Sequence, residues 1–190
     1  MYSYFEETKK IITIITYFTS LGVLMRFTKI VGLTGLALTL GMGSAYAADG
    51  ATPEEVVAKV RAAAEAIAKD STAALAEMNK KDGEWVWKDS YIFAYDCKAD
   101  KMAAHPMKAS LVGGPVLQIK DKAGKELFKE LCSAGEQEKG GWVTYMWPKP
   151  GSDAPVQKIS YAVQVNGSTV QVGAGVYGDN KLEDLNKLLK

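Results

Sequence analysis

Four residues are the first candidates for catalysis or ligand binding. They are the single histidine His105, the cysteines Cys97 and Cys132, and Lys158 in an aromatic, strand-like region. Histidine binds metals and transfers protons near neutral pH. Here no cluster of histidine, cysteine and carboxylate residues has metal-ligand spacing, and the G-x-S-x-G motif of hydrolases is absent. We therefore predict no metal, no cofactor and no enzymatic activity, with His105 at a strand end that Pro106 terminates.

The two cysteines have interpretations that depend on the compartment. In an oxidising compartment, an even pair predicts a Cys97–Cys132 disulfide. We favour this bridge because free thiols are rare outside the cytoplasm. The alternative is two separate buried thiols, and a reduced Cys97 or Cys132 would allow a thiol-redox enzyme. Titration of free thiols distinguishes these alternatives.

The N-terminal quarter of the chain favours export. Residues 25–29 carry two positive charges, residues 30–42 form an apolar run, and Ala45-Tyr46-Ala47 matches the small-x-small site of signal peptidase. The apolar run is too short to cross a bilayer comfortably, since a spanning helix needs about 20 residues. We predict a signal peptide over 25–47, cleavage after Ala47, and a periplasmic or secreted mature chain over 48–190 without a stable membrane anchor.

Residues 1–24 do not fit this pattern, because a signal peptide that began at residue 1 would be too long. We interpret them as a mis-annotated extension from an upstream start codon, with Met25 as the true start. The alternative is a membrane segment over residues 11–25, which threonine and serine residues dilute. No cysteine follows the cleavage site, so we expect no lipoprotein anchor.

The composition is that of a globular domain, with 47% hydrophobic and 24% charged residues. The formal net charge is +1, which offers no electrostatic case for binding nucleic acid or an anionic membrane surface. Residues 48–190 are enough for one domain.

The mature chain begins with a long helix. Thr52 and Glu55 form a capping box with Pro53 in the first turn, and an alanine-rich apolar stripe continues at helical spacing to about Asn79. The narrow stripe predicts close packing against a flat surface. Shorter helices are predicted at 125–138 and from residue 179 to the end.

Strand patterns occupy most of the remainder, and a two-residue hairpin turn is predicted at Asn166-Gly167. The predicted strands are 91–97, 102–105, 142–147, 156–165 and 169–177. Adjacent strands with segregated helices are typical of an α+β fold. We therefore expect a long N-terminal helix packed on an antiparallel sheet of about five strands, with a short middle helix and a C-terminal helix.

The last predicted strand has two different faces. Alternate residues from Val170 to Val176 are apolar and should meet the long helix, whereas Gly173 and Gly175 lie on the opposite face. Glycine within a strand often marks close approach by a ligand or another backbone. We expect the missing side chains to leave a hollow over the sheet, in which Lys158 would hold a carboxylate. The alternative is that a tryptophan packs into this space.

Five sequence elements occur in an order that is typical of one family. They are Y-I-F-A-Y-D at 91–96, A-H-P with L-V-G at 104–113, D-K-A-G-K-E-L-F at 121–128, G-W-V-T-Y-M-W-P at 141–148 with K-I-S-Y at 158–161, and G-A-G-V-Y at 173–177. With them, residues 87–179 resemble the single Cache domains, the PAS-like extracellular sensor modules of bacterial receptors.

The resemblance implies a helix laid across an antiparallel sheet whose other face holds a pocket for a small organic acid. The ligand-binding residues that it implies, together with the two strand glycines, are His105, Tyr145, Trp147, Lys158, Tyr161, Gly173, Gly175 and Tyr177. Strand alternation puts Lys158 and Tyr161 on opposite faces, so we expect at least one of them to be structural unless a bulge intervenes.

Two functions fit this resemblance. We favour a periplasmic sensor-type domain that binds a small organic acid and presents the bound state to a membrane signalling partner, such as a sensor kinase or chemoreceptor. A separate partner is expected because no signalling module follows the domain in this sequence. The alternative is a subunit that docks on a membrane sensor without any ligand. A thermal-shift screen with small carboxylates distinguishes the two.

Overall fold

The first element of the computed structural model, which describes residues 50–190, is the helix α2 (Pro53–Lys69). The predicted capping box is present: the Thr52 hydroxyl accepts a hydrogen bond from the Glu55 N–H (3.2 Å), and the Glu55 carboxylate accepts one from the Thr52 N–H (2.9 Å). The buried side of α2 consists of Val56, Val60, Ala63 and Ile67.

The predicted single helix to Asn79 is two helices, because the chain leaves the helical conformation at Asp70. Asp70 has an extended backbone with φ of −151°, and its carboxylate accepts a hydrogen bond from the Ala73 N–H (3.0 Å). It therefore caps a second helix, α3 (Ser71–Met78). Aspartate favours this cap position over a helix interior, since its short side chain competes for backbone N–H groups.

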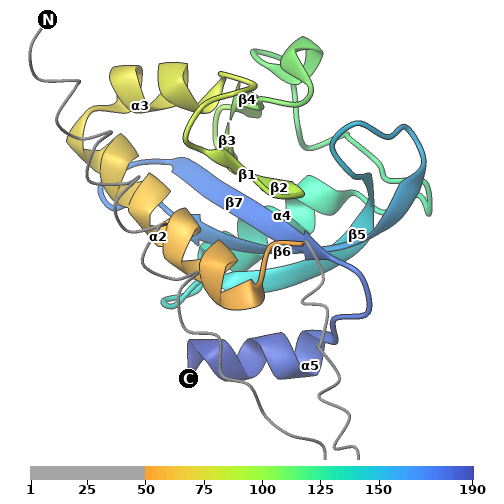
Figure 1. Ribbon diagram of the computed structural model, residues 1–190. Coiled ribbons are helices and arrows are strands. Elements are labelled where there is room, and N and C mark those ends of the chain that lie inside the picture. The colour runs from red at the N-terminus through yellow and green to blue at the C-terminus, as the bar shows by residue number, and fades with distance from the viewer. Residues whose placement is uncertain (1–49) are drawn as a thin grey trace, which may run out of the picture. The chain divides into compact units, whose positions relative to one another are not determined.

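The five main strands form one antiparallel sheet in the order β4-β3-β7-β6-β5 (Figure 1). They are β3 (Phe93–Asp96), β4 (Lys101–Ala104), β5 (Gly141–Pro148), β6 (Pro155–Gln164) and β7 (Val170–Tyr177). A two-stranded hairpin of β1 (Val86–Trp87) and β2 (Ser90–Tyr91) precedes them. The predicted α+β fold with a five-stranded antiparallel sheet is confirmed.

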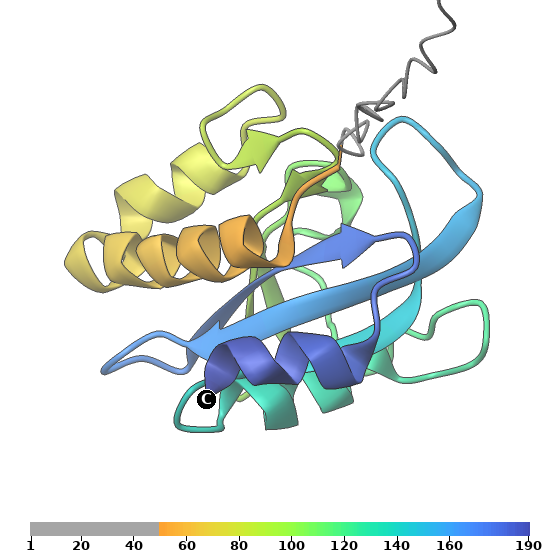
Figure 2. The same ribbon diagram turned by 60° about the horizontal axis from the view of Figure 1, so that its bottom comes forward.

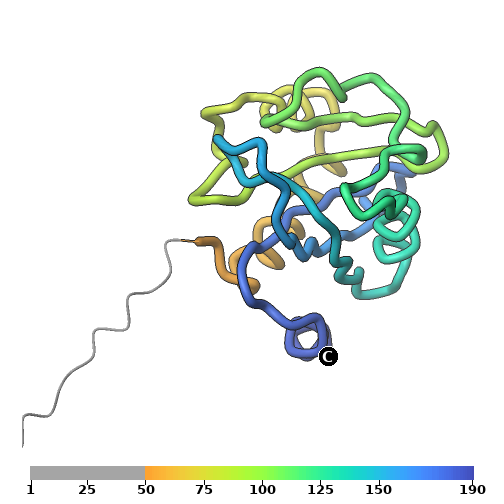
Figure 3. The backbone as a smooth tube through the Cα atoms, turned by 90° about the vertical axis from the view of Figure 1, so that its right-hand side faces the viewer, coloured from red at the N-terminus to blue at the C-terminus, as the bar shows by residue number. Residues whose placement is uncertain are grey.

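Helices cover both faces of this sheet. The helix α2 packs on β7 and β6, and the tail helix α5 (Leu182–Leu185), which continues as a 3-10 helix over Asn186–Leu189, packs on β5 at the same face (Figure 2). The helix α4 (Leu127–Gly135) packs on β5, β6 and β7 at the opposite face. The tail helix lies at the other end of the domain from the segment around residues 95–115 (Figure 3).

The β6–β7 connection is longer than the predicted two-residue turn. Asn166 and Gly167 are its first two residues, and the Ser168 N–H donates to the Val165 carbonyl (3.1 Å). The last hydrogen bond between the two strands runs from the Val165 N–H to the Val170 carbonyl (2.9 Å), so the loop has four residues.

The predicted extension over 1–24, the signal peptide over 25–47 and the cleavage after Ala47 lie outside the described residues. Between residues 50 and 190, no helix has both the length and the apolar character needed to cross a membrane.

Candidate ligand-binding site

Lys158 lies in the middle of β6, on the face that α4 covers. It pairs with Tyr145 on β5 and with Tyr177 on β7, so the three side chains form a row across the sheet. The lysine side chain is fully buried, and its Nζ has no hydrogen-bond partner within residues 50–190. A buried amine without a partner is costly, because it has lost its hydration and gained no acceptor.

Aromatic rings surround the Lys158 amine. Its Nζ lies 4.1 Å from the ring centroid of Tyr91, 5.2 Å from that of Tyr177 and 5.4 Å from that of Phe93. Burial lowers the pKa of Lys158 to about 7, and the charge of Asp89 opposes this shift. The aromatic faces attract the ammonium form but cannot accept its hydrogen bonds as an anion would.

His105 is also buried at this face and is fixed by two hydrogen bonds. Its backbone N–H donates to the Asn79 side-chain oxygen (3.0 Å), and its ring Nδ1 accepts from the backbone N–H of Lys108 (3.0 Å). Burial, together with the nearby Lys158 charge, lowers the pKa of His105 to about 3. The ring is therefore neutral at physiological pH, and its proton is on Nε2, which can act as a donor.

Three hydroxyl or indole groups at the site have partners within the protein. The Tyr145 hydroxyl is 2.8 Å from the Ser160 hydroxyl. The Trp147 indole N–H donates to the Tyr91 hydroxyl (2.9 Å), and the Tyr177 hydroxyl donates to the backbone carbonyl at the end of β5 (2.9 Å). These bonds hold the rings in place around the lysine.

The predicted hollow over the strand glycines is wrong, because other side chains occupy this space. A Cβ built on Gly175 would lie 2.6 Å from Cε of Lys158 and would also overlap the Ser160 hydroxyl. A Cβ built on Gly173 would lie 2.8 Å from the Phe93 ring. The glycines therefore allow the side chains of Lys158 and Phe93 to lie flat on the sheet. Neither Trp142 nor Trp147 fills the space over the glycines.

The open space at the site is a small cavity beside these residues. It has a volume of about 10 Å³, close to the space that one water molecule needs. Its lining consists of Tyr91, Phe93, His105, Leu127, Phe128, Tyr145 and Trp147. None of these side chains is acidic.

The structure brings seven of the eight predicted residues to this face of the sheet. The exception is Tyr161, which lies on the face that α2 covers, called the helix side below. Its ring centroid is 5.3 Å from that of Trp142, and its hydroxyl donates to the Lys139 carbonyl (2.6 Å). No bulge between Lys158 and Tyr161 interrupts the register of β6, so alternation separates the two.

Sequence reasoning left out Tyr91, Phe93 and Ser160, which contribute to the surroundings of the amine or the cavity. In the sequence, Tyr91 and Phe93 were assigned to the predicted strand 91–97 and to the first family element, but not to the site. The signal that could have identified them is the antiparallel pairing of that strand with the glycine-bearing strand. Phe93 pairs with Gly173, which turns the aromatic face toward Lys158.

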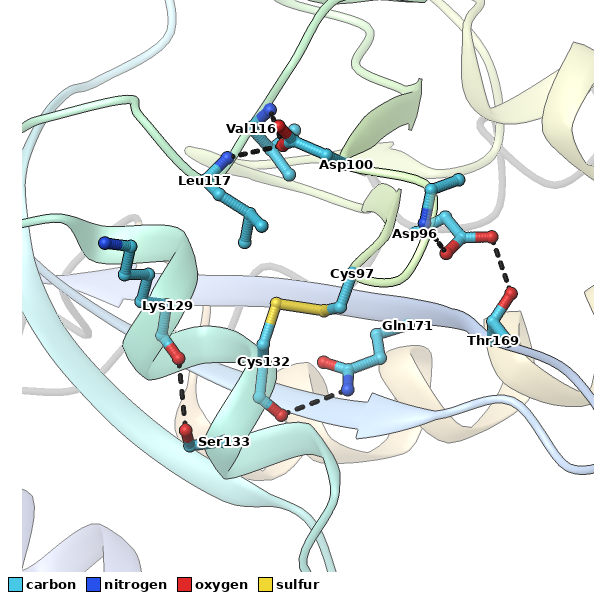
Figure 4. Close-up of a disulfide and its surroundings, with 11 residues drawn as sticks. Asp96, Cys97, Asp100, Val116, Leu117, Lys129, Cys132, Ser133, Thr169 and Gln171 are labelled. Carbon is cyan, nitrogen blue, oxygen red and sulfur yellow. Dashed lines mark hydrogen bonds between the residues drawn. A yellow bond between two sulfur atoms is a disulfide. The ribbon is translucent and has the colours of Figure 1, made fainter.

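A disulfide fixes α4 against this face (Figure 4). Cys97, in the turn after β3, is bonded to Cys132 on α4, as predicted. The side-chain amide of Gln171 on β7 donates to the Cys132 carbonyl (3.0 Å). Because both cysteines of the chain are in this bond, the thiol-redox alternative has no free thiol.

Comparison with protein families finds a match to the family model of the Single Cache domain 2 over residues 50–189. The chain belongs to this family. The match includes every residue of the Lys158 site, so the predicted family resemblance is confirmed.

Two curated relatives of this Cache domain are signalling proteins. It is 35% identical over 92 residues to the methyl-accepting chemotaxis protein McpP of Pseudomonas putida, covering 48% of this chain and 17% of that protein. It is 31% identical over 93 residues to the sensor histidine kinase MctS of Rhizobium johnstonii, covering 49% of this chain and 20% of that protein. The alignments thus span a fifth or less of the length of these relatives.

Solved structures with a similar fold are chemosensory domains. A methyl-accepting chemotaxis protein from Vibrio parahaemolyticus has a TM-score of 0.55 and 25% identity, covering 70% of this chain and 89% of that one. A periplasmic sensor domain of a chemotaxis protein has a TM-score of 0.51 and 30% identity, covering 67% of this chain and 90% of that one. A structure described as the basis for carboxylic acid recognition by a Cache chemosensory domain has a TM-score of 0.56 and 27% identity, covering 66% and 92%.

Proposed function

We propose that this Cache domain binds a small carboxylate at the Lys158 amine in the periplasm and presents the bound state to a membrane signalling partner. The observation that carries the proposal is a fully buried amine, enclosed by aromatic side chains, for which the described part of the chain supplies no acceptor. A carboxylate would supply the missing acceptor and the opposite charge, and its short apolar part would contact the rings.

The surrounding groups favour an acid without an amino group. The Nε2–H of His105 adds a second donor, whereas no acidic side chain lines the cavity to receive an ammonium group. The nearby Asp89 carboxylate is already engaged, because it accepts from the Ala51 N–H (2.8 Å) and pairs with Lys149 (3.2 Å). We therefore expect monocarboxylates to bind better than amino acids of the same length.

The location and the partner rest on the sequence and the relatives. The predicted signal peptide over 25–47 would export the domain, and one structural neighbour is described as periplasmic. The curated relatives are a chemotaxis receptor and a sensor kinase, which favours binding and signalling over catalysis. We propose a chemoreceptor or a sensor kinase as the membrane partner.

A thermal-shift screen tests the proposal. The panel is acetate, propionate, butyrate and lactate, with glycine and alanine as amino-acid counterparts, in a buffer free of carboxylates. A carboxylate at 100 times its Kd should stabilise the protein by about 2.7 kcal/mol. Lys158→Met should abolish the shift, whereas Lys122→Met, at an exposed turn, should retain it.

The pH dependence of the shift gives a second test. Because the pKa of Lys158 is lowered to about 7, binding of a carboxylate anion should be stronger at pH 6 than at pH 8.5. Below about pH 5 the ligand itself takes up a proton, so affinity should fall again. Binding that is equally strong at pH 6 and pH 8.5 would contradict a role for the lysine charge.

The ligand-free interaction subunit stays as the alternative, because the cavity of about 10 Å³ is too small for any member of the panel. Flat melting curves for all six compounds, with no difference between the wild type and Lys158→Met in any response, would favour this alternative.

A further inference from the structure

We propose that Trp147 is the movable wall through which a carboxylate reaches Lys158 from an adjoining outer pocket. This inference rests on the proposed function, since it concerns the entry of that ligand. The starting observation is the contrast between a buried amine, which has no hydrogen-bond partner among residues 50–190, and an inner cavity of about 10 Å³. Even acetate, with four non-hydrogen atoms, needs more room than one water molecule, so the site has to widen.

Most walls of the inner cavity are anchored. Leu127 and Phe128 belong to α4, which the disulfide and the Gln171 amide hold against the sheet. Phe93 and Tyr145 are buried, the Phe93 ring packs edge-on against Phe128, and the Tyr145 hydroxyl is hydrogen-bonded to Ser160 (2.8 Å). The backbone and the ring of His105 each have a hydrogen bond of their own.

Trp147 is held more loosely than these walls. It is near the end of the edge strand β5, it is only partly buried, and its indole N–H has one partner, the Tyr91 hydroxyl (2.9 Å). The ammonium of Lys108 lies 4.9 Å from the centroid of the indole ring. One hydrogen bond, this cation–π contact and ring contacts with His105 and Tyr145 (6.1 and 6.2 Å between centroids) hold the side chain in the closed position.

A second pocket lies on the other side of this tryptophan. Its volume is about 190 Å³, and it is formed largely by the loop over residues 148–153. Tyr91 and Trp147 line both the outer pocket and the inner cavity. Because Tyr91 is almost fully buried and Trp147 is not, the indole is the part of the partition that can swing outward and join the two spaces.

The outer pocket suits an approaching anion. Lys81, Lys108 and Lys149 line it, and Asp153 is its single acidic lining residue. Lys149 is also paired with Asp89 (3.2 Å), so the positive charge comes chiefly from Lys81 and Lys108. A cluster of positive charge at a pocket raises the local concentration of anions and their rate of association. Opening would also release the Trp147 N–H from its acceptor, the Tyr91 hydroxyl, which leaves the indole N–H as a further donor for the carboxylate.

Fluorine NMR of protein labelled with 5-fluorotryptophan tests the proposal, with propionate as the probe. The resonance of Trp147 is identified by its loss in Trp147→Phe. Titration should shift this resonance and leave that of Trp142 unchanged, because Trp142 is on the same strand but faces the opposite side of the sheet.

The rate of association gives the second measurement. Tyr91→Phe retains the ring but removes the acceptor of the indole bond, so it should raise the association rate of propionate several-fold. The matched variant Tyr161→Phe removes a hydroxyl on the helix side and should leave the rate unchanged. The NMR titration of the wild type stands even where a variant fails to fold.

The outcomes separate the two proposals. If propionate binds but the Trp147 resonance does not shift and Tyr91→Phe associates at the wild-type rate, Trp147 is not the entry wall and the carboxylate function stands. If no carboxylate binds, both proposals are wrong. A shift of Trp147 together with faster association in Tyr91→Phe supports the movable wall.

Discussion

The two faces of the sheet bury different kinds of side chain, and adjacent residues on β6 show the contrast. Ile159 points to the helix side, where it packs with aliphatic residues such as Val176 and Val60. Lys158 points to the other side and ends among aromatic rings, and its amine has no acceptor from residue 50 onward. A shift of one residue along the strand thus separates a stabilising side chain from a destabilising one.

The face under α2, called the helix face below, stabilises the fold, whereas the Lys158 face is the binding face of our proposal. The aliphatic cluster under α2 gains free energy by removing apolar surface from water. On the opposite face a buried amine has no partner within the described domain, and burial of such an amine costs free energy. Destabilising groups are often kept at functional sites, because function needs them there. We therefore expect substitutions on the two faces to change stability in different directions.

The largest expected effect concerns the disulfide that holds α4 over the binding face. The bond joins cysteines 35 positions apart, and loss of a crosslink of this length should lower the free energy of unfolding by roughly 4 kcal/mol. Urea denaturation of the Cys97→Ala/Cys132→Ala protein measures the loss. The control is dithiothreitol, which should destabilise the wild type and leave the double variant unchanged. Equal stability of both proteins would contradict a structural role for the bond.

On the helix face, Ile159→Ala should lower the free energy of unfolding by about 3 kcal/mol, because it leaves a cavity among closely packed side chains. Val156→Ala, at a far more exposed position of the same strand, is the matched control and should change stability by less than about 1 kcal/mol. Similar losses for both variants in urea denaturation would show that the helix face is not a tightly packed core.

The neighbouring substitution on the binding face should have the opposite sign. Lys158→Met replaces a buried amine by an apolar side chain of similar length, so it should raise the free energy of unfolding by about 1–3 kcal/mol at pH 6.5. A loss of stability would mean that the lysine is a structural residue with a partner in solution.

The gain should depend on pH in a defined direction. The pKa of Lys158 falls from 10.5, the ordinary value of a lysine side chain, to about 7 in the folded protein, so between these values the unfolded chain binds the extra proton. The stability contributed by this group therefore rises with pH across that window, by at most about 1.4 kcal/mol per pH unit. The advantage of Lys158→Met should be greatest below pH 7 and shrink toward pH 10. A constant difference from pH 6.5 to pH 9.5 in carboxylate-free buffer would contradict it.

The smallest expected effect is at the hydroxyl pair of the binding face. Tyr145→Phe removes the hydrogen bond to Ser160 and should cost about 1 kcal/mol. Adding Ser160→Ala should cost little more, because the two hydroxyls satisfy each other. Additive losses in the double variant would show that the two groups have other partners.

Local patterns in the sequence predicted much of this fold. The capping box at Thr52, the alternation of the strands and the apolar face from Val170 to Val176 all follow from residue spacing, and the structure retains them. The helix break at Asp70 was missed because the apolar stripe continues across it in the sequence. The four-residue loop around Gly167 was missed because a two-residue turn explains the same dipeptide.

The binding face was predicted less completely. Alternation identified the side that carries Lys158 and correctly separated it from Tyr161. It could not show what occupies the space over Gly175, because that depends on where the long side chain of Lys158 lies. The proposed role of Trp147 as a partition also follows only from the tertiary structure, because segments far apart in the sequence line the two cavities that it separates.

The sequence by itself determined which side chains share a face, since strand and helix periods are local properties of the backbone. It also determined that an even pair of cysteines was available for a bridge. Only the tertiary structure decided that Lys158 is buried and has no acceptor among the residues that the structure describes. Its aromatic neighbours Tyr91 and Phe93 are more than 60 positions earlier in the chain. The pairing of β3 with β7 and of β7 with β6 brings Phe93 to its amine, and Tyr91 comes from β2, which packs on β7.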